Sequence, residues 1–178
     1  MQTQEFHSTT ENALYKMYSF MSYRNNGEVL KCTLRKPVNP LLVKRLATLV
    51  KKTNAKLVLS SAWREIPSAV IKLMNSLNKE DLYLYSMTPI GALYDKLAQS
   101  PWKDTPRTGK YDWEDDRTFE RGAEIAVWVW ENKPDKFVIL DDDTSDISNF
   151  FPRNCIRTKW NTGLTDTDVE KAIAILGD

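Results

Sequence analysis

The stretch that decides the fold is Phe137–Asp146, FVILDDDTSD, in which a short apolar run ends in a cluster of carboxylates. A second stretch, Lys56–Arg64 (KLVLSSAWR), has the same form but ends in paired serines. Short, uninterrupted apolar runs are typical of strands that are buried on both faces of a parallel sheet. Because helical patterns separate these runs, we expect an α/β fold with a mainly parallel sheet covered by helices on both faces.

The remaining elements follow from spacing and caps. Asn39 is a plausible cap for a helix that starts at Pro40 and ends at Thr53-Asn54, and Thr165 with Asp168 forms a capping-box-like start to the last helix. Residues 11–21 fit a helix, although 18–21 could instead enter a strand. The other expected elements are strands at 28–34, 56–60, 82–85, 137–140 and 155–158, and helices at 66–77 and 118–132.

Bulk properties suit one soluble domain spanning residues 1–178, with an irregular insertion at about 91–117. The chain has 178 residues, of which 42% are hydrophobic and 28% charged. It shows no apolar stretch of membrane-spanning length and no secretory signal, so we expect a cytoplasmic protein that binds no membrane. The single histidine, His7, lies in a polar leader, which argues against a histidine-based catalytic or zinc site. The sequence does not indicate an oligomeric state.

The serines and the carboxylate cluster both follow strands, and ligands of parallel sheets bind at the carboxyl ends of strands. Asp142 and Asp146 have a spacing that could aim both carboxylates at one magnesium ion. The alternative is that Asp146 caps the next short helix and the other acids are solvated.

Three further positions could hold an anion at this edge. Ser60 and Ser61 could bind a phosphate oxygen or cap a helix, and Arg64 could pair with a phosphate or a carboxylate. Arg121 lies in the first turn of a helix, where a cation suits the helix dipole poorly. An anion contact of Arg121 is therefore expected, the alternative being a surface pair with a glutamate.

Together these segments resemble the haloacid dehalogenase-like (HAD) superfamily, and most closely the small HAD domains of RNA-repair and phage proteins. The matching pieces are KLVLSSAWR, RGAEIAVWV, VILDDDTSD and TGLT, which cover residues from about 40 to 176. The resemblance implies a Rossmann-like three-layer sandwich without a large cap domain. It also implies that Ser60 is the second-motif hydroxyl, Arg121 the third-motif cation, and Asp142 and Asp146 the magnesium-binding fourth motif.

The first motif of that superfamily, Asp-x-Asp after an apolar strand, has no counterpart here. Its best match places Ser22 and Arg24 at the aspartate positions, and a second register places Thr33 and Arg35 there. The sequence contains no aspartate before Asp81. Since loss of a covalent nucleophile costs on the order of 10⁶-fold in rate, we expect a phosphatase fold without phosphatase activity.

A domain that no longer hydrolyses should act by binding. The candidates for phosphate or nucleic-acid binding are Arg24, Ser60, Ser61, Arg64 and Arg121. A second group, in the irregular insertion, mixes aromatic and basic side chains that could anchor a protein partner, stack on bases or pack into the core: Trp102, Lys103, Arg107, Lys110 and Trp113.

The whole chain also resembles the phage-encoded Alc type of protein, which shuts off host transcription by acting on RNA polymerase. That resemblance implies a protein of the host cytoplasm with host RNA polymerase and DNA as partners, no required cofactor, and magnesium as a possible ligand. Two alternatives stay open. One is a magnesium-dependent HAD phosphatase acting on nucleic-acid ends or small phosphate esters, with a nucleophile such as Ser22. The other is a phosphate sensor that binds without turnover.

Overall fold

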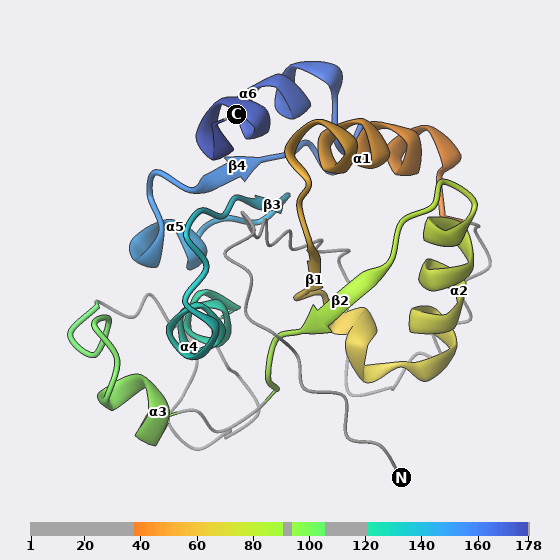
Figure 1. Ribbon diagram of the computed structural model, residues 1–178. Helices are drawn as coiled ribbons and strands as arrows, with labels where there is room; N and C mark the ends of the chain where they lie inside the picture. The colour runs from red at the N-terminus through yellow and green to blue at the C-terminus, as the bar shows by residue number, and fades with distance from the viewer. Residues whose placement is uncertain (1–37, 91–93, 106–120, 178) are drawn as a thin grey trace, which may run out of the picture.

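The structure is a computed structural model that describes residues 38–90, 94–105 and 121–177. Figure 1 shows its elements. In chain order they are α1 (Pro40–Thr53), β1 (Leu57–Leu59), the 3-10 helix η1 (Ala62–Glu65), α2 (Pro67–Asn78), β2 (Leu84–Met87), α3 (Tyr94–Ala98), α4 (Arg121–Asn132), β3 (Ile139–Asp141), α5 (Ile147–Phe150), β4 (Cys155–Arg157) and α6 (Asp166–Leu176). The elements expected within residues 1–37 lie outside the described part of the chain.

All strand pairing within the described ranges is parallel. β1 pairs with β2, and β3 pairs with β4, so these strands form two small sheets of two strands each. The helices α2 and α5 connect the members of the two pairs along the chain, as crossover connections between parallel strands require. The expected α/β class with parallel strands is confirmed.

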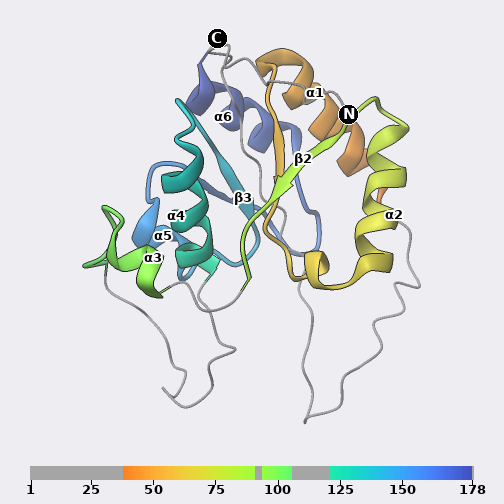
Figure 2. The same ribbon diagram turned by 60° about the horizontal axis from the view of Figure 1, so that its bottom comes forward.

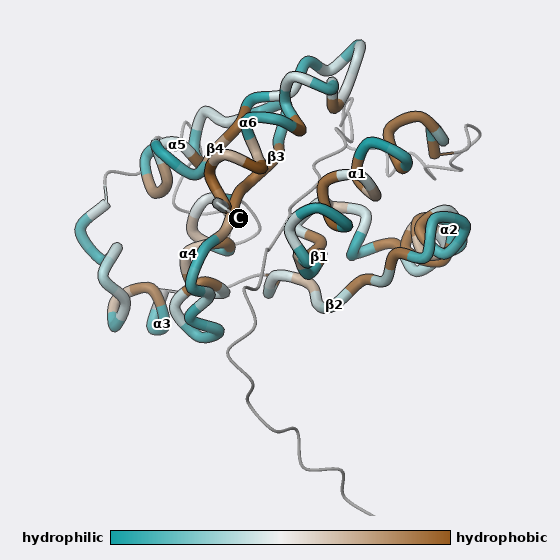
Figure 3. Tube along the Cα trace, turned by 45° about the horizontal axis from the view of Figure 1, so that its top comes forward, coloured by the Kyte–Doolittle hydropathy of each residue, from teal (hydrophilic) through white to brown (hydrophobic). Residues whose placement is uncertain are grey.

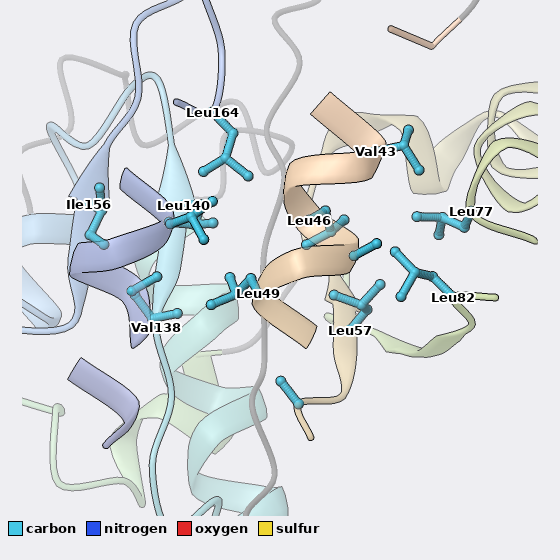
Figure 4. Close-up of a cluster of buried hydrophobic side chains, with 14 of the residues drawn as sticks. Val43, Leu46, Leu49, Leu57, Leu77, Leu82, Val138, Leu140, Ile156 and Leu164 are labelled. Carbon is cyan, nitrogen blue, oxygen red and sulfur yellow. The ribbon is translucent and has the colours of Figure 1, made fainter. Parts of the chain in front are cut away.

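Alternate residues of β1 and β3 face two different hydrophobic cores, because successive side chains of a strand point to opposite faces. Leu57, Leu59 and Leu140 belong to a core that also contains buried residues of α1, α2 and α6, drawn in Figure 4. Val58 and Ile139 belong to a second core built with α4 and α5. Figures 1 and 2 show α1 beside α6 on one side of the strands and α4 beside α5 on the other. The strands are therefore the middle of three layers.

The helix boundaries follow from local capping, as the sequence predicts. The side chain of Asn39 accepts a hydrogen bond from Leu41 N at 3.0 Å, and Asn54 ends α1 in the left-handed conformation at φ 51°. At α6, Thr165 and Asp168 form a capping box. Figure 3 shows the resulting pattern, with hydrophobic stretches along β3 and β4 and hydrophilic positions along the helices.

Two segments differ from expectation. The strand expected at 82–85 begins at Leu84, and its side chains alternate between half-buried and exposed instead of being buried throughout. The part of the irregular insertion that the structure describes contains the short helix α3, because Leu97 is buried in the core beside α4. None of the described helices is both long and apolar enough to cross a membrane.

Candidate functional site at the carboxyl ends of the strands

Ser60, at the end of β1, and Asp141, at the end of β3, face the same side of the strand layer. Val58 and Ile139 face α4, and the residue two positions along a strand faces the same way. Ser60 and Asp141 are both buried, with exposed fractions of 0% and 1%. Ser60 and the first acid of the carboxylate cluster therefore lie together, where the strands end and α4 begins. The carboxyl ends of β1 to β4 and the start of α4 are called the carboxyl rim below.

The hydroxyl groups at the end of β1 have different roles. Ser60 Oγ accepts a hydrogen bond from Thr88 Oγ1 at 3.3 Å, so two buried hydroxyls meet where β1 and β2 end. Ser61 Oγ accepts a hydrogen bond from Trp63 N at 3.2 Å and caps η1. Of the two serines, Ser60 presents its hydroxyl toward the neighbouring strand end, whereas Ser61 fixes the start of the following turn.

Both terminal nitrogens of the Arg64 guanidinium make hydrogen bonds within the protein. Its guanidinium donates to the carbonyl of Ser60, to the carbonyl of Pro89 at 3.4 Å and to Glu124 Oε2 at 2.5 Å. The side chains of Arg64 and Glu124 are only 3% and 7% exposed. Burial raises the pKa of Glu124 to about 7, although the neighbouring Arg64 lowers it. Arg64 thus makes the carboxylate contact that the sequence left as one of two alternatives.

Arg121 makes its anion contact inside the domain. Its Nη1 lies 3.3 Å from Asp141 Oδ2, and the side chains are 24% and 0% exposed. Asp141 Oδ1 also accepts a hydrogen bond from Asp143 N at 2.9 Å. Burial raises the pKa of Asp141 to about 7, against the lowering effect of Arg121. Arg121, at the start of α4, and the last residue of β3 therefore form an ion pair at the rim.

Asp146 caps a helix, but a different one from the helix that directly follows it. Its Oδ2 accepts a hydrogen bond from Gly122 N at 2.9 Å, at the start of α4, and it makes no side-chain cap bond to α5. The carboxylate thus meets the positive end of the α4 dipole. Gly122 permits the approach, since a Cβ there would lie 2.6 Å from the Phe150 ring and 2.9 Å from the carbonyl oxygen of Asp146.

The magnesium ion that the resemblance implies fits these residues in part. Asp142 Oδ1 is buried without a hydrogen-bond partner, as a cation ligand would be. Within the described ranges, however, no group of three or more His, Cys, Asp or Glu side chains is arranged to hold a metal. Asp142 and Asp146 are the residues that would hold magnesium, and the ion would neutralise charge on a bound phosphate.

The other residues singled out in the sequence lie apart or outside the described ranges. Trp102 is half-buried and meets Phe151 edge to face at 5.1 Å, which agrees with the core-packing alternative, and Lys103 is exposed. Ser22, Arg24, Arg107, Lys110 and Trp113 fall in segments that the structure does not describe.

Two residues of the site were not identified from the sequence: Glu124 and Thr88. Asp141 was identified as part of the carboxylate cluster after the strand, but not as the partner of Arg121. Glu124 carries a signal, because it is the one acid within the otherwise apolar run GAEIAVWVW. Thr88 shows no such signal, since its role depends on the pairing of β1 with β2.

Comparison with known proteins agrees with this geometry. The family described as the HAD domain in Swiss Army Knife RNA repair proteins matches residues 17–169. No curated protein and no solved structure matches the chain significantly. Because the family match covers most of the sequence, and the described strands are parallel as in an α/β fold, the chain belongs to this family of HAD domains.

Proposed function

We propose that this HAD domain acts by binding and does not hydrolyse phosphate esters. The observation that carries the proposal is the lack of any aspartate before Asp81, which leaves the first motif degenerate. Ser22 and Arg24, or Thr33 and Arg35, stand where the nucleophile and the general acid would be. The expected loss of about 10⁶-fold in rate corresponds to roughly 8 kcal/mol of barrier, more than hydroxyl and metal contacts restore.

The contacts at the rim support a role in binding. Three links join the strand ends to one another and to α4: Ser60 with Thr88, Arg64 with Glu124, and Arg121 with Asp141. Within the described ranges, these links connect the residues that form the rim. A preformed rim with a cation at its edge suits recognition of an anionic ligand.

For the partners, we propose host RNA polymerase together with DNA, in a phage-type shutoff of host transcription. The support is the overall likeness to the Alc type of protein and the net positive charge of residues 1–80, which hold 13 Lys and Arg against 5 Glu. Capture of host polymerase from a lysate by the tagged protein tests this. If the folded, tagged protein captures no polymerase, the proposed partner is wrong.

Hydrolysis is tested by phosphate release from an aryl phosphate and from a 3′-phosphorylated oligonucleotide, with magnesium present. Asp142→Asn is the matched control, because Asp142 is the carboxylate with an unpartnered buried oxygen. We expect no release above that control. Release by the wild type that disappears in Asp142→Asn overturns the proposal.

The same assay decides the second candidate, a magnesium-dependent phosphatase acting on nucleic-acid ends. The observation that favours it is the buried, unpartnered Asp142 Oδ1, a suitable cation ligand. A serine such as Ser22 would then have to attack phosphorus, with no histidine near it in the sequence to activate it. Thermal stabilisation by phosphate without release would instead identify a sensor.

A further inference from the structure

Trp160 has the highest exposed fraction among the large hydrophobic side chains that the structure describes, at 82%. Removal of apolar surface from water is favourable, and tryptophan contributes more such surface than any other residue. The folded chain leaves most of the apolar surface of Trp160 in water. Exposed tryptophans are common anchors for a ligand or partner, which can bury this surface.

The turn that carries Trp160 has a fixed conformation. Gly163 N donates to the carbonyl of Lys159 at 2.6 Å, which closes the turn around Trp160. Gly163 has φ +63°, and a Cβ there would lie 2.7 Å from the Leu42 side chain. Leu164, the next residue, is fully buried. The protein thus holds this tryptophan in solvent on a well-packed support.

The turn belongs to the carboxyl rim. Thr158 N donates to the carbonyl of Asp141 at 2.8 Å, which places the end of β4 directly beside the end of β3. Trp160 is two residues further on, at most about 7 Å along the chain. The backbone of Trp160 therefore lies close to the end of β3 that carries Asp141.

Two cations, Arg157 and Lys159, precede the tryptophan in sequence. Both are exposed, and Arg157 Nε donates to the carbonyl of Asp142 at 3.3 Å, which places the guanidinium beside the end of β3. Among the nearby acids, Asp166 is paired with Arg45, whereas Asp143 is exposed. An aromatic face beside cations is the combination that binds unpaired bases and their phosphates.

From this arrangement we infer that the carboxyl rim binds single-stranded nucleic acid, with one unpaired base stacked on Trp160 and the adjoining phosphates at Arg157 and Lys159. This inference rests on the proposed function, because it takes the rim to act by binding. It adds the class of ligand that the rim binds. Stacking and phosphate contacts are common to RNA and DNA strands, so both are probes of the same site.

The test is the fluorescence anisotropy of labelled single-stranded 12-mers, one RNA and one DNA, titrated with the full chain. Trp160→Ala should weaken binding roughly tenfold or more, and Trp160→Phe should retain much of the affinity. Lys159→Gln should lower the slope of log affinity against log salt by about one. The matched control is Tyr83→Ala, which removes another exposed aromatic, 72% exposed, at the opposite end of the strands. It should bind as the wild type does.

Equal affinities of Trp160→Ala and wild type, for RNA and DNA alike, overturn the inference. So does a wild type that binds no single strand but captures polymerase only when Trp160 is present, because the tryptophan then anchors a protein. Since Trp160 is exposed, the melting temperature of Trp160→Ala should equal that of the wild type, which separates lost binding from lost folding. Phosphate release by the wild type contradicts the proposed function but leaves this contact intact, so the two can fail independently.

Discussion

Two arginine–carboxylate pairs join the start of α4 to the strand ends, and the helix contributes the acid to one pair and the base to the other. Toward β1, the helix supplies the acid, Glu124, and the segment after the strand supplies Arg64. Toward β3, the helix supplies the base, Arg121, and the strand supplies the acid, Asp141. Both acids are buried, and burial raises the pKa of each to about 7.

The pairs differ in their access to solvent. Arg64 is 3% exposed and bonded to two backbone carbonyls besides Glu124, whereas the Arg121 side chain is 24% exposed. Either cation would leave a buried carboxylate behind if it moved away, since the side chains of Glu124 and Asp141 are 7% and 0% exposed. Arg64 has two backbone contacts besides its acid, so we expect the Arg64 pair to support the fold more strongly. Arg121 is the more exposed of the two cations, so it is the one that an incoming anion would meet first.

The largest effect is expected from breaking the Arg64 pair. Arg64→Met leaves Glu124 buried without its partner, and we expect the free energy of unfolding to fall by about 3–5 kcal/mol in a urea titration at pH 8. The double variant Arg64→Met/Glu124→Leu removes both charges and should recover most of that loss. A loss below about 1 kcal/mol for the single variant would mean that the pair does not support the fold.

The pH dependence of the free energy of unfolding tests the Arg64–Glu124 pair in a second way. The pKa of Glu124 is about 7 in the folded chain against 4.5 for the ordinary side chain. The folded state therefore retains a proton that the unfolded state has lost, and the associated stability disappears as pH rises through 7. Between pH 5 and pH 8 the wild type should lose roughly 2 kcal/mol relative to Glu124→Gln, which cannot titrate. A constant difference between the two proteins would show that Glu124 is ionised throughout.

Gly122→Ala tests how closely the first turn of α4 packs against Asp146 and Phe150. The added Cβ meets the Phe150 ring and the carbonyl oxygen of Asp146, so α4 must shift away from Asp146. We expect a loss of about 2 kcal/mol in the free energy of unfolding, measured by denaturant titration. Without such a clash, alanine in place of glycine in a helix stabilises by about 1 kcal/mol, so a gain in stability would contradict the close contact.

The smallest effect is expected from the Arg121 pair. Arg121→Met should cost about 1–2 kcal/mol at pH 8 and less at pH 6, because Asp141 keeps its bond from Asp143 N and can take up a proton. Arg121→Lys should retain most of the stability. Denaturant titrations at both pH values measure this, and a cost equal to that of Arg64→Met would remove the distinction between the two pairs.

Much of the fold could be predicted from the sequence because its signals are local. The apolar runs at 56–60 and 137–140 and the caps at Asn39 and Thr165 depend only on neighbouring residues. The start of β2 and the helix α3 could not be predicted as well, because packing on other elements decides them. Of the candidate site, the sequence identified Ser60, Arg64 and Arg121 at the strand ends and the start of α4, but not the partner of each.

The sequence by itself determined an α/β domain with parallel strands, the positions of the motif residues, and the absence of an aspartate upstream of the serines. The tertiary structure alone decided which charges meet. Arg64 and Glu124 are 60 residues apart, and Asp146 caps a helix that begins 25 residues before it. Such contacts have no local signal, because they depend on how α4 lies against the strand ends, and burial in that interface is what raises the pKa of both acids.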